Sequence, residues 1–307
     1  MKKNEFRNIL AFAVTTILAV LLSAQAFCIP ADSLVPVSDT TAKKPVESRR
    51  KNNVYRVNYY VTGSIIAVGF AGDYFAISRL KKKGNLSQAE IDVLNPSLLN
   101  TIDQWGLKQD ASQRTAFAKA SDYTESAIFL LPALLMIDKK IRKQWLDVLM
   151  IYVEGHTVTF TIYNYGARGP TFHNELRPLA YYPVSEYVSD DQRKSGQNRN
   201  SIYSGHTASV AFTTFFMAKV LTDFHPGMKM GTKILLYSAA FIPPAIEGYM
   251  RVRALGHFPS ECMTGLVMGA ALGIIVPALH KRHLKNISVG MFDVPGGMGV
   301  NLCYRIQ

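Results

Sequence analysis

The sequence predicts an all-α protein, built as a multi-span bundle of membrane helices. Hydrophobic residues make up 48% of the 307 residues and charged residues only 18%, a balance that does not fit a disordered chain. Apolar runs of helical length recur between residues 57 and 279, and clusters of lysine and arginine separate several of them. This alternation is typical of membrane helices that are joined by basic loops.

The net charge of +12 supports the same class of protein. In a soluble protein such an excess would suggest a nucleic acid partner, but no aromatic-basic RNA motif and no zinc-finger spacing is present. Basic loops next to anionic lipid headgroups explain the charge more simply. We therefore expect a membrane, and no nucleic acid, as the partner. The three cysteines are too few and too scattered for a disulfide framework or a zinc site, and we expect no metal and no cofactor.

The N-terminal region reads as an export segment followed by a linker. Residues 1–26 have a basic start, an apolar core and the small-residue ending Ala24-Gln25-Ala26, as in a signal peptide cleaved before Phe27 or in an uncleaved N-terminal anchor. Residues 27–53, rich in Ser, Thr, Pro and Lys, are expected to form a flexible linker. A helical domain over residues 54–285 and a tail over residues 286–307 follow.

The helical domain divides into apolar runs and polar connections. The stretch 85–123 is polar and amphipathic, so it predicts surface or interfacial helices that start near Ser87 and Ser112. Pro243-Pro244 should kink one apolar helix. The apolar runs cover residues 57–78, 126–137, 145–165, 207–221, 234–249 and 263–279.

An acidic residue, a glycine repeat and the C-terminal tail each predict a local feature. Glu154 lies within an apolar run, and an ionisable group at membrane depth either serves function or faces the bundle interior. Glycines at 265, 269 and 273 repeat every four residues and predict a face for close helix packing. In the tail, Pro295-Gly296-Gly297 predicts a turn between extended segments 287–292 and 299–306.

The candidate chemistry centres on Ser204-Gly205-His206. This triplet lies between a polar connector and the apolar run that begins at Val210, so it falls at the start of a helix. Unpaired N–H groups at a helix start can hold an anion. Gly205 allows close approach of the backbone, and the imidazole of His206 can give or take a proton near neutral pH.

Two flanking segments complete a pattern. Arg177-Pro178 lies upstream, and Arg251, His257 and Glu261 follow downstream with five and three residues between them. In order and spacing these segments resemble the type 2 phosphatidic acid phosphatase (PAP2) superfamily over roughly residues 145–279. That superfamily includes membrane lipid phosphatases, soluble acid phosphatases and vanadate haloperoxidases. Tyr203 before the triplet resembles the membrane lipid phosphatases of Bacteroidetes type. The resemblance implies a PAP2 or haloperoxidase-like helical bundle.

The sequence departs from the family pattern at four positions. Pro170 stands where the family has an anion-binding lysine, and Arg168 is a candidate substitute. Tyr203 replaces a proline, Met250 a serine, and Glu261 an aspartate, which keeps the charge but adds a methylene.

The resemblance implies a role for each matching residue. His257 would attack phosphorus, Glu261 would orient and polarise it, and His206 would act as general acid and then as base. Arg177 and Arg251 would bind the phosphoryl oxygens. The N–H groups of Ser204 and Gly205, with the Ser204 hydroxyl, would complete the phosphate cradle, and no metal is required.

The expected function is metal-independent hydrolysis of a lipid phosphate through a phosphohistidine. Phosphatidic acid, phosphatidylglycerol phosphate, undecaprenyl pyrophosphate and a lipid A phosphate are candidate substrates. A soluble periplasmic acid phosphatase of the same superfamily and a non-catalytic lipid-binding membrane protein are the alternatives. The basic cluster Lys139–Lys143 predicts a cytoplasmic loop in the bacterial inner membrane, with the site facing the periplasm. Counting both 57–78 and 126–137 as crossings after a cleaved signal gives the opposite side.

Overall fold

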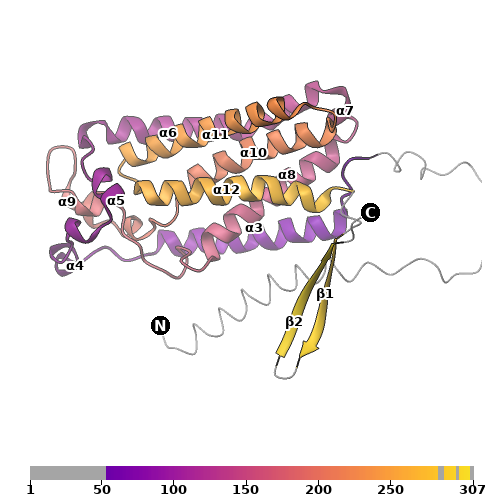
Figure 1. Ribbon diagram of the computed structural model, residues 1–307. Coiled ribbons are helices and arrows are strands. Elements are labelled where there is room, and N and C mark those ends of the chain that lie inside the picture. The colour runs from indigo at the N-terminus through magenta and orange to yellow at the C-terminus, as the bar shows by residue number, and fades with distance from the viewer. Residues whose placement is uncertain (1–52, 283–286, 295–296, 305–307) are drawn as a thin grey trace, which may run out of the picture.

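The computed structural model describes residues 53–282, 287–294 and 297–304. Among these residues, six long helices pack lengthwise into one bundle (Figure 1), which confirms the predicted all-α class. Their bounds are α3 Tyr59–Lys81, α6 Arg114–Leu130, α8 Trp145–Tyr165, α10 Gly205–Phe224, α11 Met230–Arg253 and α12 Pro259–His280. The predicted export segment 1–26 and nearly all of the predicted linker 27–53 lie outside the described residues.

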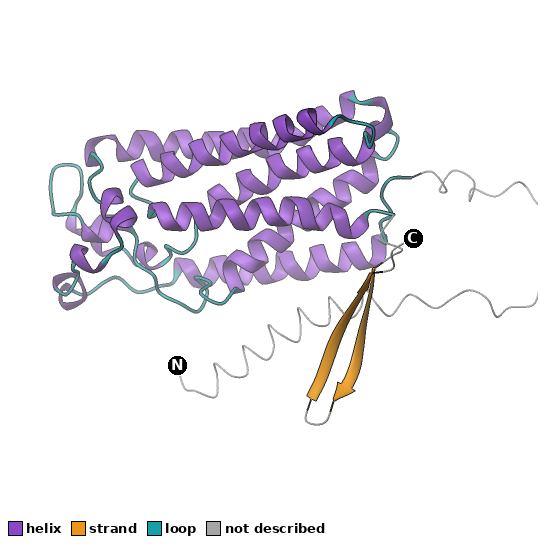
Figure 2. Cartoon of the chain, in the orientation of Figure 1, coloured by secondary structure: helices purple, strands orange, loops and turns teal. Residues whose placement is uncertain are grey.

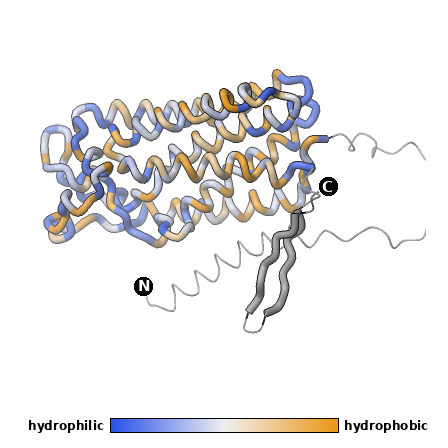
Figure 3. The backbone as a smooth tube through the Cα atoms, viewed as in Figure 1, coloured by the Kyte–Doolittle hydropathy of each residue, from blue (hydrophilic) through white to orange (hydrophobic). Residues whose placement is uncertain are grey.

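Short helices mark the two ends of the bundle. Helices α4 (Gln88–Asp92), α5 (Thr101–Gly106) and α9 (Asp190–Lys194) gather at one end, which we call the α5 end. Helix α7 (Lys139–Arg142) lies at the opposite end, which we call the α7 end (Figure 1). Figure 3 shows hydrophilic residues concentrated in the loops of the α5 end.

Helix α10 lies at the centre of the bundle, and α12 packs directly on its backbone. A Cβ atom built on Gly265, Gly269 or Gly273 would lie only 2.1–2.6 Å from carbonyl oxygens of α10. The predicted small-residue face is therefore confirmed, since any side chain at these positions would force the two helices apart. Beyond this contact, the rings of Tyr152 and Phe212 pack in the core between α8 and α10.

Helix α6 extends the prediction for residues 85–137. The expected starts near Ser87 and Ser112 are confirmed, because the Ser87 side chain caps α4 and a helical segment begins at Ala111. The polar stretch after Ser112 and the apolar run 126–137 form one long element, which a 3-10 helix at Leu131–Ile137 completes. Ser121 is the one buried residue of α6, and its hydroxyl donates to Glu247 of α11. The other residues of this helix are exposed or half-buried, as expected for a helix at the surface of the bundle.

Three helical segments are long and apolar enough to cross a membrane, namely Tyr59–Lys81, Ala111–Ile137 and Pro259–His280. Large apolar side chains on α3 remain exposed, including Phe70 and Tyr74. Inside the bundle, Glu154 accepts a hydrogen bond from Thr62 at 2.9 Å and lies 3.0 Å from the imidazole of His280. Glu154 therefore faces the bundle interior and pairs there. These features indicate association with a membrane.

The chain enters and leaves the bundle at the α7 end. Tyr55 and Lys281 form an isolated β-bridge there, and the Arg56 N–H donates to the His280 carbonyl at 2.9 Å.

Pro243 and Pro244 lie inside α11, which continues through both. Beyond α12, strands β1 (Ile287–Val294) and β2 (Gly297–Tyr304) pair antiparallel (Figure 2). This hairpin confirms the extended segments predicted for the tail.

Candidate active site

The α5 end of the bundle brings the motif residues together from four elements. Arg177 precedes a short 3-10 helix at Pro178–Tyr181, and His206 lies in the first turn of α10. Arg251 lies in the last turn of α11, and His257 lies in the connection between α11 and α12. Residues that are up to 80 positions apart in the sequence thus lie near one another. The charges of Arg177, Arg251 and His206 all act on His257.

The connection between α11 and α12 is built to bury His257. Leu255 adopts the left-handed conformation with φ 56°, which ends α11. Gly256 packs against the guanidinium of Arg251, where a Cβ atom would lie 2.9 Å from Nη2. A side chain at position 256 would therefore displace the arginine. The next helix is held in place by Asp103 of α5, whose carboxylate accepts from the N–H and the hydroxyl of Ser260 at 3.0 and 2.7 Å.

His257 is held in one tautomer. Its Nδ1 lies 2.6 Å from the carbonyl oxygen of Ser201, and because a carbonyl only accepts, Nδ1 carries the proton. Nε2 is then the unprotonated nitrogen, as a nucleophile requires. Burial, followed by the charges of Arg177, Arg251 and His206, holds the pKa of His257 well below its usual range. His257 is therefore neutral at physiological pH, and the two arginines and the second histidine are its electrostatic neighbours.

Glu261 supports His257 less directly than the family pattern implies. Its Oε2 lies 3.5 Å from Nδ1 of His257, too far for a strong hydrogen bond. The same oxygen accepts from the Ser201 hydroxyl at 2.6 Å and from the Phe258 N–H at 2.9 Å. The longer side chain caps α12 and fixes Ser201, whose carbonyl in turn holds the imidazole. The predicted direct partner of His257 is thus replaced by a backbone carbonyl that Glu261 holds in place.

The buried Arg251 and the half-buried Arg177 have few acceptors. Arg177 approaches the Asn200 carbonyl only at 3.3–3.4 Å, and burial, then the charge of Arg251, lowers its pKa. Arg251 is 7% exposed, and its Nε has no partner among the described residues. Its Nη1 lies 3.4 Å from the Ser121 hydroxyl and 3.7 Å from the Asp122 carboxylate. Two adjacent guanidiniums with spare donors form a site for an anion.

Helix α6 adds carboxylates that the sequence did not indicate. The Nε2 of His206 lies 3.1 Å from Asp122 Oδ1 and 3.3 Å from Glu125 Oε2. Nearby, the buried Glu247 of α11 accepts a hydrogen bond from the Ser121 hydroxyl. The only sequence signal was the three-residue spacing of Asp122 and Glu125, which also fits a solvated surface. Burial, followed by the charge of Arg251, lowers the pKa of His206 to about 4, whereas the Asp122 carboxylate raises it. Asp122 therefore supports a proton on His206 against burial and the two arginines.

Two predicted phosphate ligands have other roles. The Ser204 N–H donates to the Glu261 carbonyl at 3.2 Å, and its hydroxyl caps α10 by accepting from the Thr207 N–H at 3.3 Å. Both groups are therefore engaged in holding α10 against α12. Arg168 pairs with Glu175 at 2.6 Å on the exposed surface, with 62% of its side chain accessible. This pairing occupies the Arg168 guanidinium with a carboxylate, and its predicted role in place of the missing lysine stays a prediction.

Two tyrosines lie next to Gly205 and close to the arginine pair. The Tyr163 side chain, from α8, lies within electrostatic range of both Arg177 and Arg251. A Cβ atom on Gly205 would lie 3.6 Å from this ring, an ordinary van der Waals distance, and the ring meets the Tyr203 ring edge-on at 5.6 Å. The packing therefore does not require glycine at position 205, and the predicted contact of the Gly205 N–H with phosphate stays a prediction.

The family model of the PAP2 superfamily matches residues 148–285. This part of the chain belongs to the PAP2 superfamily. The match covers α8, α10, α11 and α12 and contains all the motif residues, whereas α3 and α6 precede it. No curated protein and no solved structure matches the sequence. The superfamily includes phosphatases that act on phosphate esters, often of lipids, and the match therefore supports a phosphatase at the level of the family.

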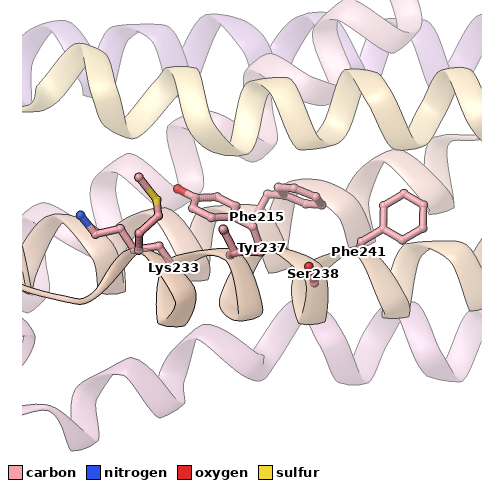
Figure 4. A pocket seen from close by; sticks show the side chains of 7 residues that line it. Phe215, Lys233, Tyr237, Ser238 and Phe241 are labelled. Carbon is pink, nitrogen blue, oxygen red and sulfur yellow. The ribbon is translucent and has the colours of Figure 1, made fainter.

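A second feature of this PAP2 protein lies far from the motif residues. A cavity of about 610 Å³ opens between α10 and α11. Figure 4 shows the rings of Phe215, Tyr237 and Phe241 and the ammonium of Lys233 around it. These residues belong to the half of α11 that starts at the α7 end, so the cavity has no part in the chemistry at Arg177 and His257.

Proposed function

We propose that this PAP2 protein hydrolyses a phosphomonoester of a membrane lipid, without a metal ion, through a phosphohistidine at His257. The observation that carries the proposal is a neutral, buried imidazole with a fixed tautomer in the field of two guanidiniums, of which the buried Arg251 has a donor without a partner among the described residues. An imidazole held in this way suits nucleophilic attack, and the guanidiniums supply the positive charge that phosphoryl transfer needs.

The reaction follows in two balanced steps. Nε2 of His257 attacks phosphorus while the bond to the lipid oxygen breaks, and His206 donates its proton to that oxygen. Water then attacks the phosphohistidine, His206 takes the proton from the water, and the P–N bond breaks to release inorganic phosphate. Arg177 and Arg251 hold the phosphoryl oxygens in both steps. The Nδ1–H of His257 donates to the Ser201 carbonyl, and this contact would stabilise the positive charge that the imidazole acquires.

The surroundings of His206 favour a monoester over a pyrophosphate. His206 serves the leaving oxygen, and Asp122 and Glu125 lie 3.1 and 3.3 Å from its Nε2. An alkoxide leaving group needs a proton, which the carboxylates help His206 to carry. A phosphate leaving group needs none and would be repelled by both carboxylates. Among the candidate substrates, phosphatidic acid, phosphatidylglycerol phosphate and a lipid A phosphate are therefore preferred to undecaprenyl pyrophosphate.

We further propose the bacterial inner membrane, with the α5 end facing the periplasm. The basic residues of α7, together with Lys143, belong to a short connection at the α7 end, where positive charge favours the cytoplasm. Residues 57–78 and 126–137 both belong to long elements of the bundle, so both count as crossings. A cytoplasmic α7 end then puts residue 53 in the cytoplasm, whereas cleavage before Phe27 would leave it outside. The cleaved signal and the cytoplasmic α7 end exclude each other, and the basic residues Arg79 and Lys81 in the last turn of α3 also favour a cytoplasmic α5 end. We propose the periplasmic site from the basic residues 139–143 together with the resemblance to a family whose sites are extracytoplasmic.

Phosphate release from dioctanoyl phosphatidic acid with EDTA present tests the enzymatic proposal. The wild-type protein should turn over, and His257→Ala should lose activity by at least about three orders of magnitude. Equal turnover of the two proteins would exclude a phosphohistidine at this residue, and no turnover by either would favour a non-catalytic lipid-binding protein. For the orientation, Lys108→Cys and Lys140→Cys variants without native cysteines can be labelled in intact cells with an impermeant maleimide. Labelling is expected at position 108 only.

A further inference from the structure

A second cavity, distinct from the His257 site, opens where α3 ends. Its volume is about 540 Å³, and it lies between the last turns of α3 and the segment 171–174. Arg79, Lys82 and Lys83 line it together with aromatic rings, and no carboxylate is among its lining residues. The cavity thus concentrates three positive charges without a counterion of its own.

The positive charges of this cavity are poorly compensated. Burial, with the charges of Arg199 and Arg79, lowers the pKa of Lys83 to about 8. The Lys83 ammonium donates to the carbonyls of His173 and Arg199 at 2.7 and 3.1 Å, which position it but supply no negative charge. Among the described residues, neither Arg79 nor Lys82 pairs with a carboxylate. An anion in the cavity would relieve this repulsion.

A buried hydroxyl in the cavity wall also lacks a partner. Thr171 lines the cavity, is only 3% exposed, and its Oγ1 has no hydrogen-bond partner among the described residues. A buried hydroxyl without a partner is costly, so an oxygen ligand is the expected occupant. The guanidinium of Arg79 lies over the rings of Phe75 and Phe172, with centroids at 5.9 and 6.0 Å, which hold it at the cavity.

The position of the cavity identifies the kind of anion. It lies at the end of α3, one of the segments long and apolar enough to cross a membrane. Exposed apolar side chains of this helix, including Phe70 and Ile77, lead up to it, and Phe75 is both exposed and part of the lining. A ligand with a phosphate in the cavity and acyl chains along α3 satisfies both surfaces. We propose that this cavity binds the phosphate of an anionic phospholipid.

The cavity shares a wall with the loop that holds Arg177. Lys83 bonds the carbonyl of Arg199, and the carbonyl of the next residue, Asn200, accepts from Arg177. Gly196 packs on the backbone of Lys83 so closely that a Cβ atom would lie 2.0 Å from the Lys83 carbonyl oxygen. A lipid bound beside Lys83 would therefore restrain the loop 196–200 and, through it, the guanidinium of Arg177.

Binding is measured with the full-length His257→Ala protein in detergent, so that the result does not depend on turnover. The probes are dioctanoyl phosphatidylglycerol, dioctanoyl phosphatidylcholine and inorganic phosphate, titrated by calorimetry. We expect phosphatidylglycerol to bind at least about tenfold more tightly than the other two probes. The Arg79→Gln/Lys82→Gln double variant should lose about tenfold in affinity for phosphatidylglycerol, since two charge-assisted contacts are removed. The Lys139→Gln/Lys140→Gln pair at the α7 end is the matched control and should bind like the parent protein.

Two further variants keep the test decisive if the double variant folds poorly. Lys82→Gln changes one exposed side chain and should weaken binding about threefold, and Thr171→Val removes the hydroxyl at nearly constant size and should also weaken it. Equal affinity in Lys82→Gln, Thr171→Val and the parent protein would overturn the proposal. Tighter binding of inorganic phosphate than of phosphatidylglycerol would overturn the lipid assignment in favour of a free anion.

Discussion

Replacement of Asp122 by asparagine tests whether α6 tunes the general acid. The Asp122 carboxylate lies 3.1 Å from Nε2 of His206, and 65% of its side chain is exposed. At this separation two unit charges interact by about 1 kcal/mol in a water-like dielectric, a value at the top of the range for exposed pairs. Loss of the charge should therefore destabilise the protonated imidazole by up to about 1 kcal/mol, or roughly fivefold in a step that depends on the proton.

The assay compares substrates that differ only in their need for a proton. For dioctanoyl phosphatidic acid, Asp122→Asn should lower kcat/KM by about fivefold, because the alkoxide must be protonated as it leaves. For p-nitrophenyl phosphate, whose leaving group is stable as an anion, the loss should stay within about twofold. For farnesyl pyrophosphate the rate should stay constant or rise, since one negative charge is removed from beside the leaving phosphate. Asp92→Asn, an exposed carboxylate on α4, is the control.

A uniform loss on all three substrates would refute this reasoning. It would mean that Asp122 holds the fold of the α5 end, or the position of Arg251, and does not act on the proton of His206. The circular dichroism spectrum and the melting temperature of the variant separate these cases, because a structural role lowers the melting temperature together with every rate.

Three further predictions concern the support of the nucleophile, the helix packing and the basic cavity. Glu261→Gln retains an acceptor oxygen but loses the charge 3.5 Å from His257, so kcat for phosphatidic acid should fall by roughly tenfold. A variant with the kcat of the wild type would show that the Glu261 charge does not contribute to catalysis. Gly269→Ala should destabilise the protein by about 1–3 kcal/mol, because the new methyl group meets the α10 backbone. The control Gly231→Ala has open space around it and should leave the stability unchanged. Equal melting temperatures of the two variants would contradict the close packing of α12 on α10. Lys83 loses its charge as pH rises through about 8, so the affinity for phosphatidylglycerol should fall severalfold from about pH 7 to about pH 9 at constant ionic strength. A constant affinity over this range would mean that the Lys83 ammonium does not contribute to lipid binding.

Local patterns in the sequence were sufficient for most of the long helices and for the four motif residues that lie near one another. Apolar runs of helical length predicted five of the long helices, and the glycine spacing predicted the face on which α12 meets α10. The order of Arg177, His206, Arg251 and His257 along the chain predicted that they act together, and they do lie together. These predictions hold because each depends on spacing within a helix or within a motif.

Partner choice within the site depended on contacts between distant segments. Glu261 lies four residues after His257 in the motif pattern, yet its carboxylate binds Ser201 and the start of α12 instead of the imidazole. Ser204 matches its motif and yet serves as a helix cap. The spacing of residues determines which side chains can meet, but several acceptors compete at similar distances, and the backbone of a remote loop decides among them.

Taken by itself, the sequence determined the helical class, the hairpin in the tail and the four residues that converge at the α5 end, because periodicity and motif order are local properties. Only the tertiary structure decided that Ser121 of α6 packs in the interior, that two carboxylates of α6 lie next to His206, and that Arg168 pairs with Glu175. A polar helix in water and a polar face buried against other helices have the same composition. The difference lies in which partners satisfy the polar groups, and packing alone supplies those partners.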